Sequence, residues 1–333
     1  MSGRAAGPRA PGPRAARGAA LAGIIAALAA LVLLGAVPYL FGPYWQQLGY
    51  RALQLLTLAL AWNLLAGYTG QVSLGTGAFV GLGAYAFALL GNAGGAPLPL
   101  PLPLLLLAAG AVAALFAIIV SPGLFRLRGL YFTIGSLALA EALRILMVNL
   151  GTFGGASGIV LQRSTPPYHV LYWLALLVAL AAAAIVAGVL RSPASLALRA
   201  VRDDEDVARQ MGVRSFRVKL ATFALAAFLT GVAGGLQALK LGAIEPYGAF
   251  GMAWTIDTVA VVIIGGIATR GGPVVGTLLY VALGELLRDL PELHNAIGGL
   301  FLLLVIRLAP QGLWGLLRTR LAARAAAPEA GGG

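Results

Sequence analysis

The sequence predicts an all-helical membrane protein with many spans, and three observations support this fold class. Hydrophobic residues make up 60% of the 333 residues and charged residues only 10%, whereas a soluble domain carries about 25% charged residues. Apolar runs long enough to cross a bilayer recur along the chain. Basic residues gather at the ends of these runs instead of covering one folded face. The composition therefore excludes a water-soluble globule.

The apolar runs divide the chain into a membrane domain and two tails. A span needs about 20 apolar residues, so the length leaves room for roughly eight to ten helices. The runs at 254–267 and 273–287 are short, so each is compatible with a half-span that returns without crossing. The expected runs are 19–37, 48–66, 73–90, 104–120, 130–150, 170–190, 220–239, 254–267, 273–287 and 296–308.

We expect residues 1–18 to form a disordered basic tail, because they are rich in arginine, proline and glycine. The run that follows is long enough to span and lacks a convincing cleavage site, which favours an uncleaved span over a signal peptide. The predicted permease domain covers residues 19–309, and residues 310–333 form a second tail.

The net charge of +12 comes almost entirely from arginine, since Lys219 and Lys240 are the only lysines. With the N-terminus in the cytoplasm, every strongly basic connection falls on the same side, as the positive-inside rule requires. Topology therefore explains the charge better than nucleic-acid binding does. We expect a cell-membrane protein in contact with lipid, with both termini in the cytoplasm and no nucleic-acid partner.

Several kinds of chemistry are missing from the sequence. Cysteine is absent, which excludes disulfides and thiolate sites. A Walker A motif is impossible because neither lysine follows a glycine, and H-E-x-x-H, G-x-S-x-G and a plausibly placed Ser-His-Asp set are also missing. We expect this chain to have no enzymatic activity, no metal site and no bound cofactor. If ATP drives the protein, another subunit must bind it.

A dense charged loop, residues 191–219, interrupts the apolar pattern. Asp203 is a suitable N-cap with Asp206 three residues on, so a short helix is expected over about 204–211, ending before Gly212. Its small apolar stripe is expected to contain Val207, Ala208 and Met211. Two interpretations stay open on these grounds: a solvated helix between spans, or a docking helix for a cytoplasmic partner.

Residues 63–77, NLLAGYTGQVSLGTG, are rich in glycine and small hydroxyl residues and predict a broken helix. Irregular backbone at membrane depth is tolerated where it is buried or lines a cavity. The alternative is a tight turn and a helix that packs through Gly77 and Gly81. The candidate path-lining residues, which offer polar contacts without charge, are Gln71, Ser73, Thr76 and Ser136.

One ion pair is expected inside a span. Glu141 and Arg144 are three residues apart in the run 130–150, so they can share a helix face and neutralise each other. A proton relay needs several carboxylates at membrane depth, which disfavours a stand-alone secondary transporter.

Several blocks together resemble the LivM-type permease of branched-chain amino acid ABC importers. They occur in the order of that family and spread over most of the membrane region. The blocks are WNLLAGYTGQVSLGTGAFVGLGAY (62–85), RGLYFTIGSLALAEALR (128–144), GGASGI (154–159), ALRAVRDDEDVARQMGVRSFRVKLATFALAAFLTGVAGGL (197–236) and GGIATRGGPVVGT (265–277).

This resemblance implies partners and a role for the charged loop. The partners would be a LivH-type second permease, two ABC ATP-binding subunits that hold ATP and Mg, and an extracytoplasmic solute-binding protein. The loop is similar to the EAA-type coupling helix of such permeases, although Asp206 and Val207 replace the consensus Glu and first Ala. The residues implied to couple to the ATPases are Asp203, Asp204, Glu205, Asp206, Val207, Ala208 and Gly212.

The resemblance also implies alternating access and a branched-chain amino acid as the favoured solute. Thr76 stands where many relatives have His, and Phe153 and Ser157 depart from the usual T-G-G-x-[N/D]-G pattern. Related permeases carry urea, short amides or other amino acids, so these solutes remain the alternative.

Overall fold

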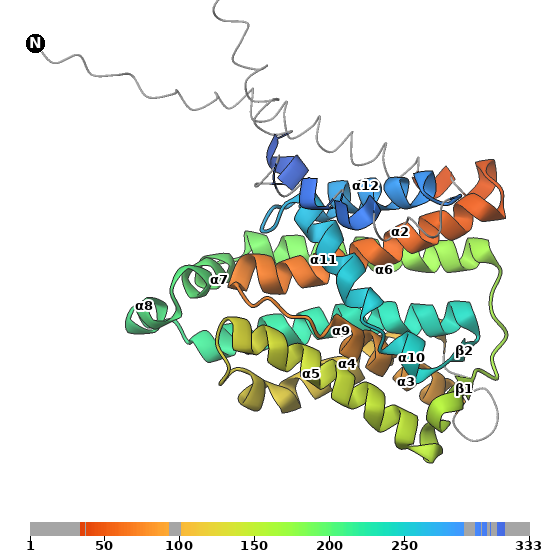
Figure 1. Cartoon of the computed structure of the whole chain (residues 1–333), viewed down its shortest axis with the longest axis horizontal. Coiled ribbons are helices and arrows are strands. Elements are labelled where there is room, and N and C mark those ends of the chain that lie inside the picture. Colours follow the sequence, from red (N-terminus) through yellow and green to blue (C-terminus); the bar gives the residue numbers. More distant parts are fainter. Residues whose placement is uncertain are drawn as a thin grey trace, which may run out of the picture.

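The computed structural model describes residues 34–36, 38–92, 101–289, 297–300, 302–304, 307 and 312–316. This part of the chain is almost entirely helical (Figure 1). Most of the expected first span and of both tails lies outside the described residues, as does the stretch 290–296 with both Glu292 and His294.

Each apolar run expected between residues 48 and 287 lies on a helix. The long elements are α2 (Pro43–Trp62), α3 (Thr76–Gly91), α4 (Leu102–Leu124), α5 (Leu130–Asn149), α6 (Tyr168–Arg191), α9 (Ser215–Leu241), α11 (Ala253–Gly265) and α12 (Gly272–Leu286). The short ones are η1 (Asn63–Gly67), η2 (Gly151–Phe153), η3 (Gly155–Ser157), α7 (Ala194–Asp203), α8 (Glu205–Gln210), α10 (Pro246–Ala249) and the strands β1 (Ile159–Val160) and β2 (Ala243–Ile244).

Among the described residues, five helical segments are long and apolar enough to cross a membrane. They are α4, α5, α6, α9 and the segment Pro246–Gly265, which joins α10 to α11. α3 and α12 are apolar but have only 16 and 15 residues, so they rise about 24 and 22 Å, less than the ~30 Å of a bilayer core. α12 thus has the short length that the sequence predicted.

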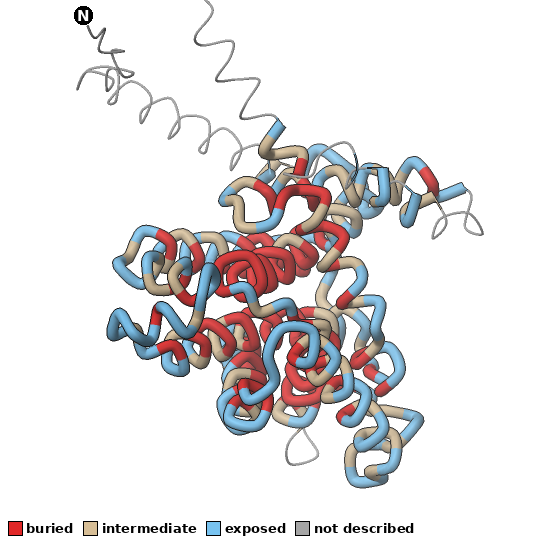
Figure 2. Tube along the Cα trace, turned by 60° about the vertical axis from the view of Figure 1, so that its left-hand side comes forward, coloured by how far each residue is buried: buried red, intermediate tan, exposed pale blue. Residues whose placement is uncertain are grey.

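α9 is the central helix and packs closely against α3 and α4. A side chain at Gly83 of α3 would collide with the backbone oxygen of Gly231, and one at Gly234 would collide with that of Val80. Such contacts between backbones need glycine on at least one helix. Figure 2 shows the buried residues gathered in the interior of this bundle. The close packing fixes the helices that carry the charged loop and the broken segment.

The two ends of the bundle differ in character. α7 and α8 project at one end, while the strands β1 and β2 lie at the other (Figure 1). The strands pair antiparallel, with Ile159 opposite Ile244. The structure therefore separates the charged loop from the connections near residues 151 and 245.

Candidate functional site

The charged loop folds into two consecutive helices, α7 and α8. α7 continues through Asp203, so the chain turns at Asp204, whose backbone is extended with φ of −157°. Asp204 Oδ1 accepts hydrogen bonds from the amides of Asp206 at 2.8 Å and Val207 at 3.0 Å. The expected N-cap at Asp203 is therefore wrong by one residue, because the preceding helix extends further than the sequence suggested.

α8 ends before Gly212, as the sequence predicted. Gly212 has φ of +86°, and the amide of Val213 donates to the carbonyl of Ala208 at 3.0 Å. The Gly212 amide donates to Arg209 O at 3.0 Å. This pair of bonds is a Schellman motif, which needs a left-handed residue at this position. α8 is thus short but fixed at both ends.

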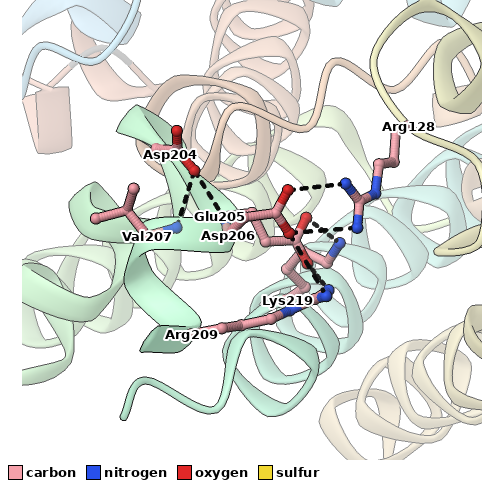
Figure 3. A network of polar contacts seen from close by, with 7 residues as sticks. All are labelled: Arg128, Asp204, Glu205, Asp206, Val207, Arg209 and Lys219. Carbon is pink, nitrogen blue, oxygen red and sulfur yellow. Dashed lines mark hydrogen bonds and ion pairs between the residues drawn. The ribbon is translucent and has the colours of Figure 1, made fainter. Parts of the chain in front are cut away.

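A buried ion pair attaches α8 to α9. Lys219 Nζ lies 3.0 Å from Glu205 Oε2, and the two side chains are only 6% and 18% exposed. Glu205 also pairs with Arg209, one turn further along α8 (Figure 3). Partial burial opposes ionisation of Glu205, but Lys219 and Arg209 outweigh it and hold its pKa below the usual value. Glu205 is therefore a carboxylate that neutralises a buried lysine.

A second ion pair connects α8 to the start of α5. Arg128 Nη1 lies 3.1 Å from Asp206 Oδ2, and both side chains are about 60% exposed. An exposed pair of this kind contributes little to stability. The pair fixes the position of α8 relative to α5, because Arg128 lies two residues before α5 and Asp206 lies in the first turn of α8 (Figure 3).

The apolar residues of α8 do not form one buried stripe. Ala208 is buried against the bundle, whereas Val207 is 48% and Met211 81% exposed. The residues of the expected stripe therefore differ in burial: Ala208 packs inward, whereas Val207 and the C-cap residue Met211 are presented outward. Side chains on these two faces can serve different contacts.

The broken segment, residues 68–75, lies between η1 and α3 and is held by neighbouring helices. On α5, Thr133 Oγ1 donates to Val72 O at 2.8 Å and Ser136 Oγ accepts from the Leu74 amide at 2.9 Å. On α11, Thr255 Oγ1 donates to Leu74 O at 3.1 Å. The helix before it ends in a π-helical turn, η1. The irregular backbone predicted here is present, and side chains satisfy its polar groups.

The candidate path-lining residues lie around this segment but not at one point. Ser73 and Thr76 line a cavity of about 20 Å³, which is room for one water molecule and no solute. Ser136 is buried and bonded to the segment as described, while Gln71 lies nearer to the charged loop. The packing through Gly77 and Gly81 is present as well, against Phe250.

A groove joins the broken segment to the charged loop. Its volume is about 630 Å³. The lining comes from four parts of the chain: Thr69–Val72, the connection into α5, the end of α7 and the first turn of α8 with Lys219. The groove brings Gln71 to the same site as the acidic residues 203–206.

The expected ion pair in the span is formed. Arg144 Nε donates to Glu141 Oε2 at 2.9 Å, and Arg144 Nη2 contacts Oε1 of the same carboxylate. The Arg144 guanidinium also lies 5.0 Å from the centre of the Tyr247 ring. The Glu141 side chain is 51% exposed. A charged pair is therefore exposed on the surface of a membrane helix.

Sequence reasoning missed the partners that lie far apart in the chain. Lys219 is 14 residues from Glu205, and Arg128 is 78 residues from Asp206. Thr133 and Thr255 were not among the candidates, although each holds the broken segment. No spacing rule links residues of different helices, so only the packing of the helices could reveal these contacts.

Comparison with known proteins places this geometry in a family. A family described as the permease component of the branched-chain amino acid transport system matches residues 44–309. The chain belongs to this family. Its members are transport permeases and not enzymes, so the protein is a multi-pass membrane protein and the permease component of a transport system.

Curated relatives of this permease agree with the assignment. Two high-affinity branched-chain amino acid transport system permease proteins LivM, from Salmonella typhimurium and Escherichia coli, are 30% and 28% identical to it, over 88% of this chain and 75% of each relative. A probable branched-chain amino acid transport permease LivM of Methanocaldococcus jannaschii is 29% identical over 51% of each chain. No solved structure matches the permease.

Proposed function

We propose that this permease forms half of the translocation path of an ABC importer in a bacterial cell membrane and that it carries branched-chain amino acids. Its partners are a LivH-type second permease, two ATP-binding subunits and an extracytoplasmic solute-binding protein. The family and the names of the curated relatives support this assignment. The basic charged loop and both termini lie in the cytoplasm under the positive-inside rule.

The observation that carries the proposal is the construction of α8. The helix is capped at both ends and anchored by a buried ion pair, yet it presents Val207 and Met211 to the outside. An anchored helix with exposed apolar residues is suited to insertion into a groove of a partner. We assign these two residues to the contact with an ATP-binding subunit.

Movement of α8 reaches the broken segment through α5. Asp206 holds Arg128 at the start of α5, and one and two turns further on Thr133 and Ser136 hold the backbone at Val72 and Leu74. When ATP binding closes the ATPases, α8 moves with them, and the chain of contacts re-packs the segment. This is alternating access between two packings of the same helices.

The surroundings of the small cavity suit a solute with an apolar side chain. Ser73 and Thr76 offer hydroxyl groups, and the aromatic rings of Trp62, Phe79 and Phe223 line the same cavity. The cavity is too small for a solute in this conformation, so the path opens by re-packing. The lining carries no fixed charge, which fits hydrophobic amino acids better than ions.

The exposed pair on α5 supports contact with the second permease. Charge in contact with lipid at membrane depth is costly, and the Glu141 side chain is half exposed in the isolated chain. A protein partner that covers this face of α5 removes that cost.

The test is uptake by the complete importer reconstituted in vesicles, with radiolabelled leucine, isoleucine, valine, urea and acetamide as solutes. We expect uptake of the three amino acids that requires ATP, both ATP-binding subunits and the solute-binding protein. Uptake by the permease alone, driven by an ion gradient, would contradict the proposal. Uptake of urea or acetamide in preference to the amino acids would overturn the solute assignment only.

A further inference from the structure

A pocket of about 230 Å³ lies between α2, α6 and α12, and it shares no lining residue with the groove or with the small cavity. Its wall is largely apolar, with Leu60, Val186 and Val274 contributed by the three helices. Two arginines, Arg191 and Arg270, complete the lining. A pocket with an apolar wall and a basic rim at the end of membrane helices fits a lipid with a charged headgroup.

One of the residues that line this pocket, Tyr68, carries a buried hydroxyl. Tyr68 is only 4% exposed, and its hydroxyl has no hydrogen-bond partner among the described residues. Buried polar groups are nearly always bonded, so each exception needs an explanation. A ligand oxygen that accepts from this hydroxyl would supply the missing bond.

The charged residues that line the pocket with Tyr68 are both arginines. The charges of Arg199, Arg202 and Arg270 all reach its ring, and no acidic residue is among those that line the pocket. To the described residues, the Arg270 side chain donates one long hydrogen bond, 3.4 Å, from Nη2 to the carbonyl of Leu190. The arginines therefore retain donors for an anion.

The polar side chain of Asn63, which also lines the pocket, is held by two hydrogen bonds. Asn63 Nδ2 donates to Thr269 O at 3.1 Å, and Asn63 Oδ1 accepts from the Ala268 amide at 2.8 Å. These bonds hold the turn 266–271 against η1. Asn63 is held by these two bonds, and Tyr68 and the arginines add further donors to the lining.

We propose that this pocket binds the phosphate group of an anionic phospholipid. The Tyr68 hydroxyl, Arg191 and Arg270 bind the phosphate, because arginine matches phosphate oxygens in geometry and charge. A soluble phosphate has the same chemistry, but the apolar wall favours a lipid. Val274 and Leu278, four residues apart on α12 and 44% and 63% exposed, extend the apolar track for an acyl chain.

The bound lipid would join three parts of the fold. Arg191 ends α6 and begins the charged loop, Arg270 belongs to the turn before α12, and Tyr68 follows η1. The proposal rests on the membrane location of these helices and is independent of how α8 meets a partner.

The experiment measures thermal unfolding of the full chain, purified in a neutral detergent, against three probes. These are dioctanoyl phosphatidylglycerol, dioctanoyl phosphatidylcholine and inorganic phosphate. We expect phosphatidylglycerol alone to raise the unfolding temperature in a saturable way. In the variant Arg191→Gln/Arg270→Gln, half of the maximal shift should need about tenfold more lipid, since it loses charge-assisted bonds.

The matched control is Arg126→Gln, because Arg126 is an exposed arginine at the end of another membrane helix, outside the pocket. It should respond as the wild type does. An equal response of the double variant, or no response of the wild type, would overturn the site. Stabilisation by inorganic phosphate that depends on the same arginines would overturn the lipid assignment in favour of a soluble anion.

If the double variant is not recovered in folded form, the variant Tyr68→Phe tests the site instead. It removes one oxygen and keeps the packing of the ring, so folding should be retained. We expect it to weaken the response to phosphatidylglycerol severalfold. An unchanged response would contradict the role of the hydroxyl.

Discussion

Lys219 lies 3.0 Å from Glu205 and is thereby joined, across 14 residues of sequence, to the helix that we assign to the ATPase contact. The ammonium group also lies 5.2 Å from the centre of the Phe125 ring. Both contacts satisfy a charge that is almost fully buried at the start of α9. Both ion pairs lie at the first turn of α8: Glu205 with Lys219 is the buried pair, and Asp206 with Arg128 is the exposed one.

Removing one member of this pair should lower the free energy of unfolding more than removing both members does. Glu205→Gln leaves Lys219 buried without a counter-charge, and we expect a loss of about 1.5–3 kcal/mol in the free energy of unfolding. Glu205→Gln/Lys219→Met should recover most of it. Denaturant unfolding of the full chain in detergent provides the three values. A double variant that is no more stable than Glu205→Gln would show that Lys219 does not depend on this carboxylate.

We expect the attachment of α8 to the rest of the bundle to change with pH only at acidic pH. The pKa of Glu205 is lowered in the folded protein, although partial burial opposes this, because Lys219 and Arg209 favour the carboxylate. A lowered pKa stabilises the fold at pH values above the usual one, and this stabilisation is lost as the pH falls through the folded pKa. We therefore expect α8 to stay attached at neutral pH and to detach only below pH 4.5, the usual value for glutamate.

A spin label can follow this detachment, because the chain contains no cysteine that would also react. The label is attached at Met211→Cys, which is exposed, with a control label at Val160→Cys at the opposite end of the molecule. Mobility should rise in acid at position 211 only. In the Glu205→Gln background the label at 211 should be mobile already at pH 7. A transition above pH 4.5 would contradict the assignment to Glu205.

The hydrogen bonds between α5 and the broken segment should be detectable by hydrogen exchange. Ser136→Ala removes the acceptor of the Leu74 amide, and an unsatisfied buried amide costs about 1–3 kcal/mol. We expect faster exchange in peptides that contain residues 72–75 and slower uptake by the importer. Ser192→Ala is the control, since the Ser192 hydroxyl bonds only within its own turn. Unchanged exchange at 72–75 would count against the contact.

The pair on α5 predicts an unequal response to two variants. Glu141→Ala leaves the Arg144 charge unpaired at membrane depth, so the recovery of folded protein should fall. Glu141→Ala/Arg144→Ala removes both charges and should be recovered in larger amounts. Size-exclusion chromatography of detergent extracts compares the two yields. Equal yields would show that the pair does not matter for folding.

The sequence predicted the helices better than it predicted the contacts between them. Apolar runs mark the membrane helices because each span must satisfy its own backbone, and Gly212 marks the end of α8 because its backbone is left-handed. The cap was missed by one residue because the end of α7 depends on Leu198 and Val201, which are buried in the fold. The residue types that end helices in a polar loop do not reveal how the apolar side chains of that loop pack.

The candidate site was predicted only in part, for a related reason. Glycine and small hydroxyl residues indicated the broken segment, but nothing in the spacing indicated that Thr133 and Thr255 hold it. Val207 and Met211 were expected on one stripe with Ala208, and the bundle instead buries only the smallest of the three. Which face of a short helix turns inward depends on its neighbours and not on its own sequence.

The most direct test of the coupling role is the amount of leucine taken up per ATP hydrolysed by the reconstituted importer. In Val207→Ser/Met211→Ser the exposed apolar side chains of α8 and of its C-cap residue are lost, while the ion pairs and the backbone bonds that cap the helix are kept. We expect this ratio to fall about tenfold, in line with the loss of one or two central contact residues, while Val160→Ser, an equally drastic change at the other end, keeps the wild-type ratio. A double variant with the wild-type ratio would contradict the assignment of α8 as the element that transmits ATP-driven movement.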